Sequence, residues 1–264
     1  MNFLTKSIPV AGLILLTACG GDSDKKAAPP KPIQSIVFLD KSTSAGGGFT
    51  EFALQKYNRT LKNLVATNIR SKGDRLDIYY IHENTIKAEA FSGTSQAAVS
   101  EDTTDMNPTD KEAIVNDFEL TLRKERTEFQ NQALKHLLTE NATATNQQTD
   151  IWGTLEVIKR IADTSSIVNV YYLSDMIESA KGANRRDFHT TPPQTREQAT
   201  DWAKTDAEVL KKEYGSIPYD KITIHFVLPF EPTSTSKENN PNVTYYWETL
   251  FELLGYKKRV EEIN

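Results

Sequence analysis

The feature that most constrains the fold is a regular alternation between short apolar runs and longer amphipathic stretches, which begins at Ile33. The short runs are nearly continuously apolar, as in buried strands, and the stretches between them repeat apolar residues at helical spacing. We predict strands at 33–40, 74–83, 166–175 and 221–229, a hairpin partner at 85–92, and helices at 49–70, 149–163, 195–215 and 243–257. This alternation predicts an α/β fold with a three-layer, Rossmann-like sheet, mostly parallel with one antiparallel edge strand, and helices on both faces.

The N-terminal residues indicate export and anchoring rather than a folded element. Ile8–Leu16 is an apolar run preceded by one cation, Lys6; it is too short to cross a bilayer and fits the core of an export signal. The end of this run, Leu-Thr-Ala-Cys at 16–19, resembles the lipobox of bacterial lipoproteins, and Cys19 is the only cysteine of the chain. The resemblance implies cleavage before Cys19 and a lipid on it. The alternative is an ordinary cleavage site that contains a cysteine.

The lipobox also divides the chain into regions. Residues 1–18 are interpreted as a signal peptide, 19–32 as a flexible tether rich in glycine, proline and charge, and 33–264 as the folded domain. We therefore expect the protein at a bacterial membrane, held by its lipid anchor. Because Gly20 rather than aspartate follows the lipidated cysteine, we expect the outer membrane if the cell is Gram-negative.

Charge and motif content argue against several function classes. The chain has 31 Lys and Arg against 36 Asp and Glu, a net charge of −5, and no basic stripe, so no nucleic-acid partner is expected. No Gly-x-Ser-x-Gly motif offers a nucleophile for acyl transfer. The three tryptophans, Trp152, Trp202 and Trp247, fall on predicted helices and are interpreted as core anchors. We therefore do not expect an enzyme.

Oxygen-bearing residues follow the predicted strands where each strand ends. Asp40 ends the first strand, with Ser42 and Ser44 after it; Asp175 ends a later strand, and Thr149 lies in a loop that enters a helix. In parallel sheets ligands bind beyond the carboxyl ends of the strands. Hydroxyls and carboxylates without histidine or thiolate form a hard oxygen site, which suits Mg²⁺ or Mn²⁺. Alone, the Asp-x-Ser-x-Ser spacing is weak, because both serines could simply cap the next helix.

Three segments carry a resemblance to a known family: IVFLDKSTSA (36–45), TDIWGTLEVI (149–158) and VYYLSDMIES (170–179). They are similar to the loops of a von Willebrand factor type A (VWA) domain with its metal-ion-dependent adhesion site, and the resemblance runs over about residues 33–257. It implies that the serines and the threonine touch one ion and that the aspartates act largely through bound water. It also implies a protein partner whose Asp or Glu carboxylate completes the ion's shell. The implied metal positions are Asp40, Ser42, Ser44, Thr149 and Asp175.

Two functions remain open on this sequence. The first is a metal-dependent, protein-binding lipoprotein of the bacterial envelope, acting in adhesion or as a scaffold. The alternative is a divalent-metal phosphohydrolase that uses Asp40 as nucleophile or metal ligand. Against it, Ser42 stands where aspartyl phosphotransferases of similar architecture carry a second acid. A general acid near Asp40 would favour the alternative, and the sequence shows none.

Two parts of the chain depart from the pattern of the family. Residues 93–148 are longer than usual and carry a helical pattern that runs from a capping box at Thr109–Glu112 to about Leu138. This segment is either an inserted helical element near the metal edge, where it could form part of the binding surface, or a longer version of a standard helix. No convincing strand follows residues 221–229, so we predict a sheet that lacks the last strand of the family.

Overall fold

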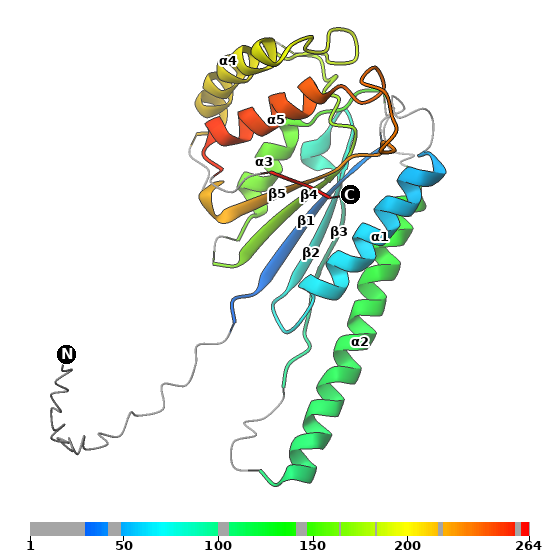
Figure 1. The fold of residues 1–264 in the computed structure, drawn as a ribbon. Coiled ribbons are helices and arrows are strands. Elements are labelled where there is room, and N and C mark those ends of the chain that lie inside the picture. Colours follow the sequence, from blue (N-terminus) through cyan, green and yellow to red (C-terminus); the bar gives the residue numbers. More distant parts are fainter. Residues whose placement is uncertain are drawn as a thin grey trace, which may run out of the picture. The chain divides into compact units, whose positions relative to one another are not determined.

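The structure is a computed structural model, and the residues from Lys31 onward form one compact unit. Figure 1 shows how its helices and strands are arranged. The residues that the structure describes are 30–41, 49–99, 106–140, 147–163, 165–182, 184–215, 219–256 and 260–263. Within them, no helix combines the length and the apolar character that crossing a membrane requires.

Six strands form one sheet in the order β3-β2-β1-β4-β5-β6. All neighbouring pairs are parallel except β2 and β3, which pair antiparallel at one edge. The strands are β1 (Ile33–Asp40), β2 (Arg75–Ile81), β3 (Glu89–Thr94), β4 (Ile167–Leu173), β5 (Ile222–Val227) and β6 (Glu261–Glu262). The helices are α1 (Glu51–Asn68), α2 (Pro108–Leu138), α3 (Trp152–Ile161), α4 (Arg196–Tyr214) and α5 (Pro241–Leu254), with short 3-10 turns η2 (Thr85–Lys87) and η3 (Tyr219–Lys221). The predicted α/β class, with a single antiparallel edge strand, is confirmed.

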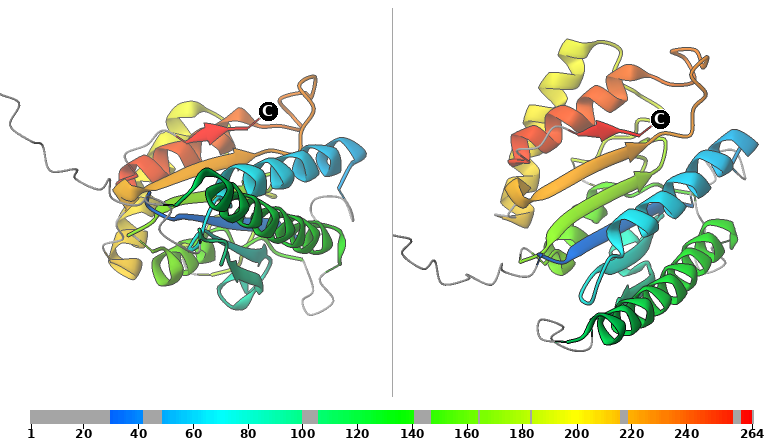
Figure 2. Two further views of the ribbon diagram at one scale, coloured as in Figure 1. Left: turned by 90° about the horizontal axis from the view of Figure 1, so that it is seen from below. Right: turned by 60° about the horizontal axis from the view of Figure 1, so that its bottom comes forward.

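Each face of the sheet has its own apolar core. Along β1, Ile36 and Phe38 belong to the cluster that includes α3, α4 and α5, whereas Val37 and Leu39 belong to the cluster that includes α1 and α2. Figures 1 and 2 show the same division, with α1 and α2 on one face of the sheet and the other three helices on the opposite face. Because successive side chains of a strand point to opposite faces, a strand covered on both sides is apolar over most of its length, as β1 is from Ile36 to Leu39.

Helix α2 accounts for most of the long segment 93–148. It is a single helix of 31 residues that begins after Asn107, whose side chain accepts a hydrogen bond from the Asp110 N–H. The predicted capping box at Thr109–Glu112 is therefore wrong, because an asparagine cap followed by Pro108 begins the helix earlier. Only the C-terminal end of α2 reaches the end of the sheet where β1 stops; its N-terminal end projects past the end where β1 begins (Figures 1 and 2).

A short sixth strand contradicts the expectation that no strand follows residues 221–229. Glu261 and Glu262 pair in parallel with β5, and the Ile263 N–H donates to the Phe226 carbonyl at 2.8 Å. Both glutamates are exposed, so no apolar alternation marks them in the sequence. Backbone pairing defines this strand, and Glu261 Oε2 also lies 3.4 Å from Nδ1 of His225 on β5.

Candidate metal site

Asp40 is the last residue of β1, and only 1% of it is exposed. Its Oδ2 accepts a hydrogen bond at 2.7 Å from Oγ of Ser174, which directly follows β4, the neighbour of β1. The same Oγ accepts the Met176 N–H at 2.9 Å. Ser174 therefore fixes the Asp40 carboxylate to the loop that follows β4. Ser174 was not among the predicted site residues, although a hydroxyl directly before Asp175 at a strand end was a usable signal.

Asp175 lies close enough to Asp40 for the two carboxylates to repel each other. Desolvation, and then the charge of Asp40, raise the pKa of Asp175 to about 7. The Ile177 N–H donates to Asp175 Oδ1 at 2.9 Å, which opposes this shift by stabilising the ionised form. A buried carboxylate whose pKa is raised by a neighbouring carboxylate favours either a retained proton or a cation bound near both.

The backbone directly after Asp175 adopts a conformation that is rare outside glycine. Met176 has φ of 63°, is fully buried, and accepts a hydrogen bond on its carbonyl from Trp247 Nε1 at 2.8 Å. Such left-handed backbone costs roughly 1–3 kcal/mol and is retained only where the surrounding core holds it. Strained backbone of this kind concentrates at functional sites, so its position next to Asp175 agrees with a binding role.

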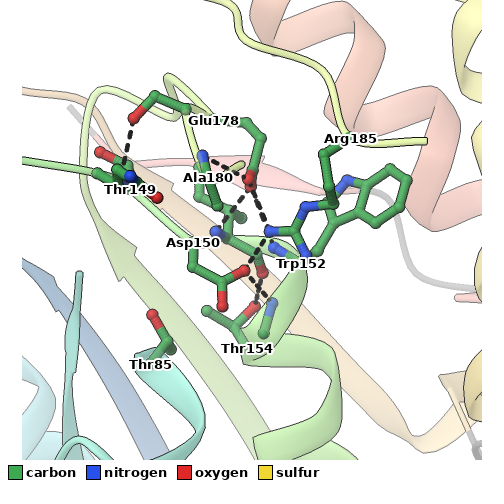
Figure 3. Close-up of polar contacts among 12 residues, drawn as sticks. Thr85, Thr149, Asp150, Trp152, Thr154, Glu178, Ala180 and Arg185 are labelled. Atoms are coloured by element: carbon green, nitrogen blue, oxygen red, sulfur yellow. Dashed lines mark hydrogen bonds and ion pairs between the residues drawn. The ribbon is translucent and has the colours of Figure 1, made fainter. Parts of the chain in front are cut away.

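Thr149 precedes α3 and is fully buried. Its N–H donates to Ser179 Oγ at 2.9 Å, and its carbonyl accepts the N–H groups of Ser179 and Ala180 at 3.0 and 3.1 Å (Figure 3). These contacts join the Thr149 loop to the loop that carries Asp175. Among the described residues, however, Thr149 Oγ1 has no hydrogen-bond partner. A buried hydroxyl without a partner is costly, and coordination to an ion would supply one.

The residue after Asp40 has a different role. Lys41 Nζ donates to the carbonyls of Leu137 and Thr139 at 2.7 and 3.0 Å, so the ammonium caps the C-terminal end of α2. Burial lowers the pKa of Lys41 to about 8. The positive charge next to Asp40 is thus directed at the helix end, and it links α2 to the end of β1.

The structure places three of the five predicted ligands at the end of β1 or in the loops that follow β4 and precede α3. Asp40, Thr149 and Asp175 are described; Ser42 and Ser44, and the lipidation residue Cys19, lie outside the described residues. Within the described residues, no group of three or more His, Cys, Asp and Glu side chains could hold a metal ion. The predicted set is not a group of that kind, because it contains only two acids, and its other members are hydroxyls. Two carboxylates with a buried, unpartnered hydroxyl fit a hard dication such as Mg²⁺ or Mn²⁺.

Comparisons with known proteins give only remote likeness. No protein-family model and no curated protein matches this chain. Among solved structures, the chain is similar to proximal thread matrix protein 1 from the mussel byssus, with 12% identity, a TM-score of 0.41, and coverage of 89% of this chain and 44% of that one. It is also similar to a von Willebrand factor type A protein from Catenulispora acidiphila, with 12% identity, a TM-score of 0.36, and coverage of 85% and 41%.

A third similar structure is the manganese-loaded TRAP protein of Plasmodium vivax, with 9% identity, a TM-score of 0.32, and coverage of 89% of this chain and 69% of that one. This chain spans less than half the length of the first two proteins. With identities of 9–12% and TM-scores below 0.5, these likenesses say nothing about function.

Proposed function

We propose that the folded domain is a VWA-type domain that binds a protein partner through a divalent cation. The observation that carries the proposal is the arrangement of Asp40, Asp175 and Thr149. Two carboxylates are close enough to repel, the Thr149 hydroxyl is buried and has no partner among the described residues, and hydrogen bonds join the segments that carry them. When bound, the ion supplies Lewis acidity toward an incoming carboxylate oxygen. The residues that would hold Mg²⁺ or Mn²⁺ are Asp40, Ser42, Ser44, Thr149 and Asp175.

The charge of this ligand set determines the chemistry of the partner. Two carboxylates balance the charge of a dication, and the hydroxyls add none, so an Asp or Glu side chain of the partner is attracted rather than repelled. The net charge of −5 opposes an acidic partner at long range, so the attraction must be local. Binding to the partner should therefore be abolished by a chelator but only moderately weakened by salt.

Metal binding tests the proposal, and Thr149→Val provides the sharpest variant. We expect the wild-type domain to bind one Mg²⁺ or Mn²⁺ by calorimetric titration, and Thr149→Val to bind roughly tenfold more weakly, since losing one oxygen ligand is worth about 1–2 kcal/mol. Because the hydroxyl is buried and unpartnered among the described residues, the valine variant should be no less stable than wild type in EDTA.

Thr154→Val is the matched control for that experiment. Thr154 Oγ1 is also buried, but it donates to the Ile151 carbonyl at 2.6 Å and lies 2.7 Å from the Tyr172 hydroxyl. Its replacement should lower stability by roughly 1–3 kcal/mol and leave the affinity for the ion unchanged. A wild-type domain that binds neither ion would refute the proposed function.

We further propose that Cys19 carries the lipid that anchors the protein to a bacterial membrane, the outer membrane in a Gram-negative cell. The lipobox at residues 16–19 and the lack of any other cysteine motivate this proposal. Cys19→Ser should prevent lipid attachment and leave an uncut precursor or a soluble form, which detergent-phase partitioning of cell extracts measures. Unchanged partitioning of the variant would rule the anchor out.

One observation favours the alternative, a divalent-metal phosphohydrolase. Asp175, with its pKa raised to about 7, lies near Asp40, where a general acid would be needed. The orientation of Lys41 argues against it, since the ammonium donates to carbonyls at the end of α2 and not toward a substrate phosphate. Hydrolysis of an aryl phosphate ester with Mg²⁺, present in wild type and lost in Asp40→Asn, would favour the enzyme; absence of turnover favours the binding domain.

A further inference from the structure

A buried ionic cluster lies beside the Thr149 loop, and none of its side chains belongs to the predicted set of metal ligands. Arg185, in the loop between β4 and α4, forms ion pairs with Asp150 and, at 2.7 Å, with Glu178 (Figure 3). The exposed fractions of the side chains are 16% for Arg185, 12% for Asp150 and 1% for Glu178. Burying three charges is costly, because desolvation offsets much of their attraction. A cluster of this kind is therefore weak evidence for stability and points to another role.

The Glu178 carboxylate accepts hydrogen bonds from three backbone N–H groups. Its Oε2 accepts the Ile151 N–H at 2.8 Å and the Trp152 N–H at 3.2 Å, and its Oε1 accepts the Ala180 N–H at 3.2 Å. Ile151 and Trp152 begin α3, whose N-cap residue makes no side-chain cap of its own. Glu178 thus caps α3 from a position 27 residues further along the chain.

Arg185 and Asp150 make further contacts with the residues at the start of α3. One Nη of Arg185 donates to both acids, and its guanidinium lies 4.9 Å from the ring centroid of Trp152. Asp150 Oδ1 accepts the Gly153 N–H at 2.8 Å, and a Cβ at position 153 would collide with the Asp150 carboxylate. The start of α3 is therefore fixed by the side chains of Glu178, Asp150 and Arg185 together.

We propose that Glu178 is the positioning residue of the ion site: it joins the loop that carries Thr149 to the loop that carries Asp175. Glu178 follows Asp175 by three residues, and its carboxylate accepts a hydrogen bond from the N–H of Ile151, two residues after Thr149. Both ligands are thereby in place before an ion binds. The inference rests on the proposed function, and it adds a residue that does not touch the ion. Residues that orient metal ligands typically contribute 10–100-fold to metal affinity.

The test uses purified protein and Mn²⁺ alone as probe. We expect Glu178→Ala to weaken Mn²⁺ binding about 10–100-fold. Glu178→Gln retains an oxygen that can accept hydrogen bonds from the Ile151 and Trp152 N–H groups. This variant should therefore lose less Mn²⁺ affinity than Glu178→Ala. In the metal-free protein, hydrogen exchange at these two amides should speed up in Glu178→Ala, because their acceptor is gone. Amides of α4 should exchange as in wild type.

Asp74 offers a matched control at the opposite end of the sheet. It too is fully buried, accepts three backbone N–H groups, from Ile33, Arg70 and Ser71 at 2.7, 2.6 and 2.9 Å, and pairs with an arginine side chain. Asp74→Ala should therefore lower thermal stability as much as Glu178→Ala. Its Mn²⁺ affinity should stay within about twofold of wild type, as expected for distant, independent sites.

The possible outcomes separate the two proposals. If the Glu178 variants bind Mn²⁺ as wild type does, or if Asp74→Ala weakens binding equally, Glu178 has no positioning role. If Glu178→Ala does not fold, Glu178→Gln decides through its Mn²⁺ affinity, because glutamine keeps an acceptor for the Ile151 and Trp152 amides. If wild type itself binds no Mn²⁺, the proposed function fails, and unchanged exchange at Ile151 and Trp152 in Glu178→Ala would also overturn the part of Glu178 in joining the loops.

Discussion

Replacing Asp40 by asparagine should abolish detectable Mg²⁺ and Mn²⁺ binding while making the metal-free protein more stable. Asparagine retains an oxygen for the Ser174 hydroxyl and has nearly the same volume, so the end of β1 should be preserved. Removing one of the two charges removes half of the negative charge that holds a dication. Calorimetric titration measures the first effect. Wild-type affinity in the variant would place the ion away from Asp40.

The stability effect of Asp40→Asn should depend on pH with a definite sign. In wild type without metal, the pKa of Asp175 is raised from 3.8 to about 7, so the folded state binds a proton that the unfolded state has released. Stability in EDTA should therefore fall as pH rises from about 4 to about 7. Asp40→Asn removes the repulsion and should be roughly 1–2 kcal/mol more stable than wild type at pH 8, and about equal at pH 4. Urea unfolding at both pH values, in EDTA, measures this; a variant less stable at pH 8 would contradict the expectation.

Replacing Trp247 by alanine should destabilise the protein by about 3–5 kcal/mol, the largest stability loss we expect from one core residue. Trp247 is fully buried and packs with its ring against Phe251 and Tyr246, with centroid distances of 6.0 and 5.1 Å. Its Nε1–H also donates to the carbonyl of Met176, the residue in left-handed backbone. Trp247→Phe keeps most of the packing but leaves that buried carbonyl without its partner, and should cost about 1–3 kcal/mol.

Trp202→Phe is the control for the tryptophan series. Trp202 is only partly buried and its ring lies beneath the guanidinium of Arg186, 4.6 Å from the ring centroid. Its replacement by phenylalanine should cost less than about 1 kcal/mol, because part of the ring already contacts water. Unfolding by urea measures all three variants. Equal losses for Trp247→Phe and Trp202→Phe would show that the bond to Met176 contributes nothing.

The strand–helix alternation was enough to predict the sheet, because buried parallel strands must be apolar and their covering helices amphipathic. The same periodicity carries no information on β6, whose two exposed glutamates pair with β5 through the backbone. For the site, Asp40 and Asp175 could be placed at one edge, since the carboxyl ends of parallel strands meet there. The hydroxyl of Ser174 beside Asp175 was a usable signal, but its bond to Asp40 and the contacts of Glu178 could not be predicted, because they join residues 134 and 27 positions apart.

The direction of β1 separates the candidate ion site from the start of the folded domain. The strand begins at Ile33, two residues after the folded unit starts, and ends at Asp40, so the candidate ion lies about 23 Å from where the chain enters the domain. If Cys19 carries a lipid, the tether joins the domain at the amino end of β1 and therefore does not attach beside the ion site. Shortening or lengthening the tether should therefore leave Mn²⁺ affinity unchanged.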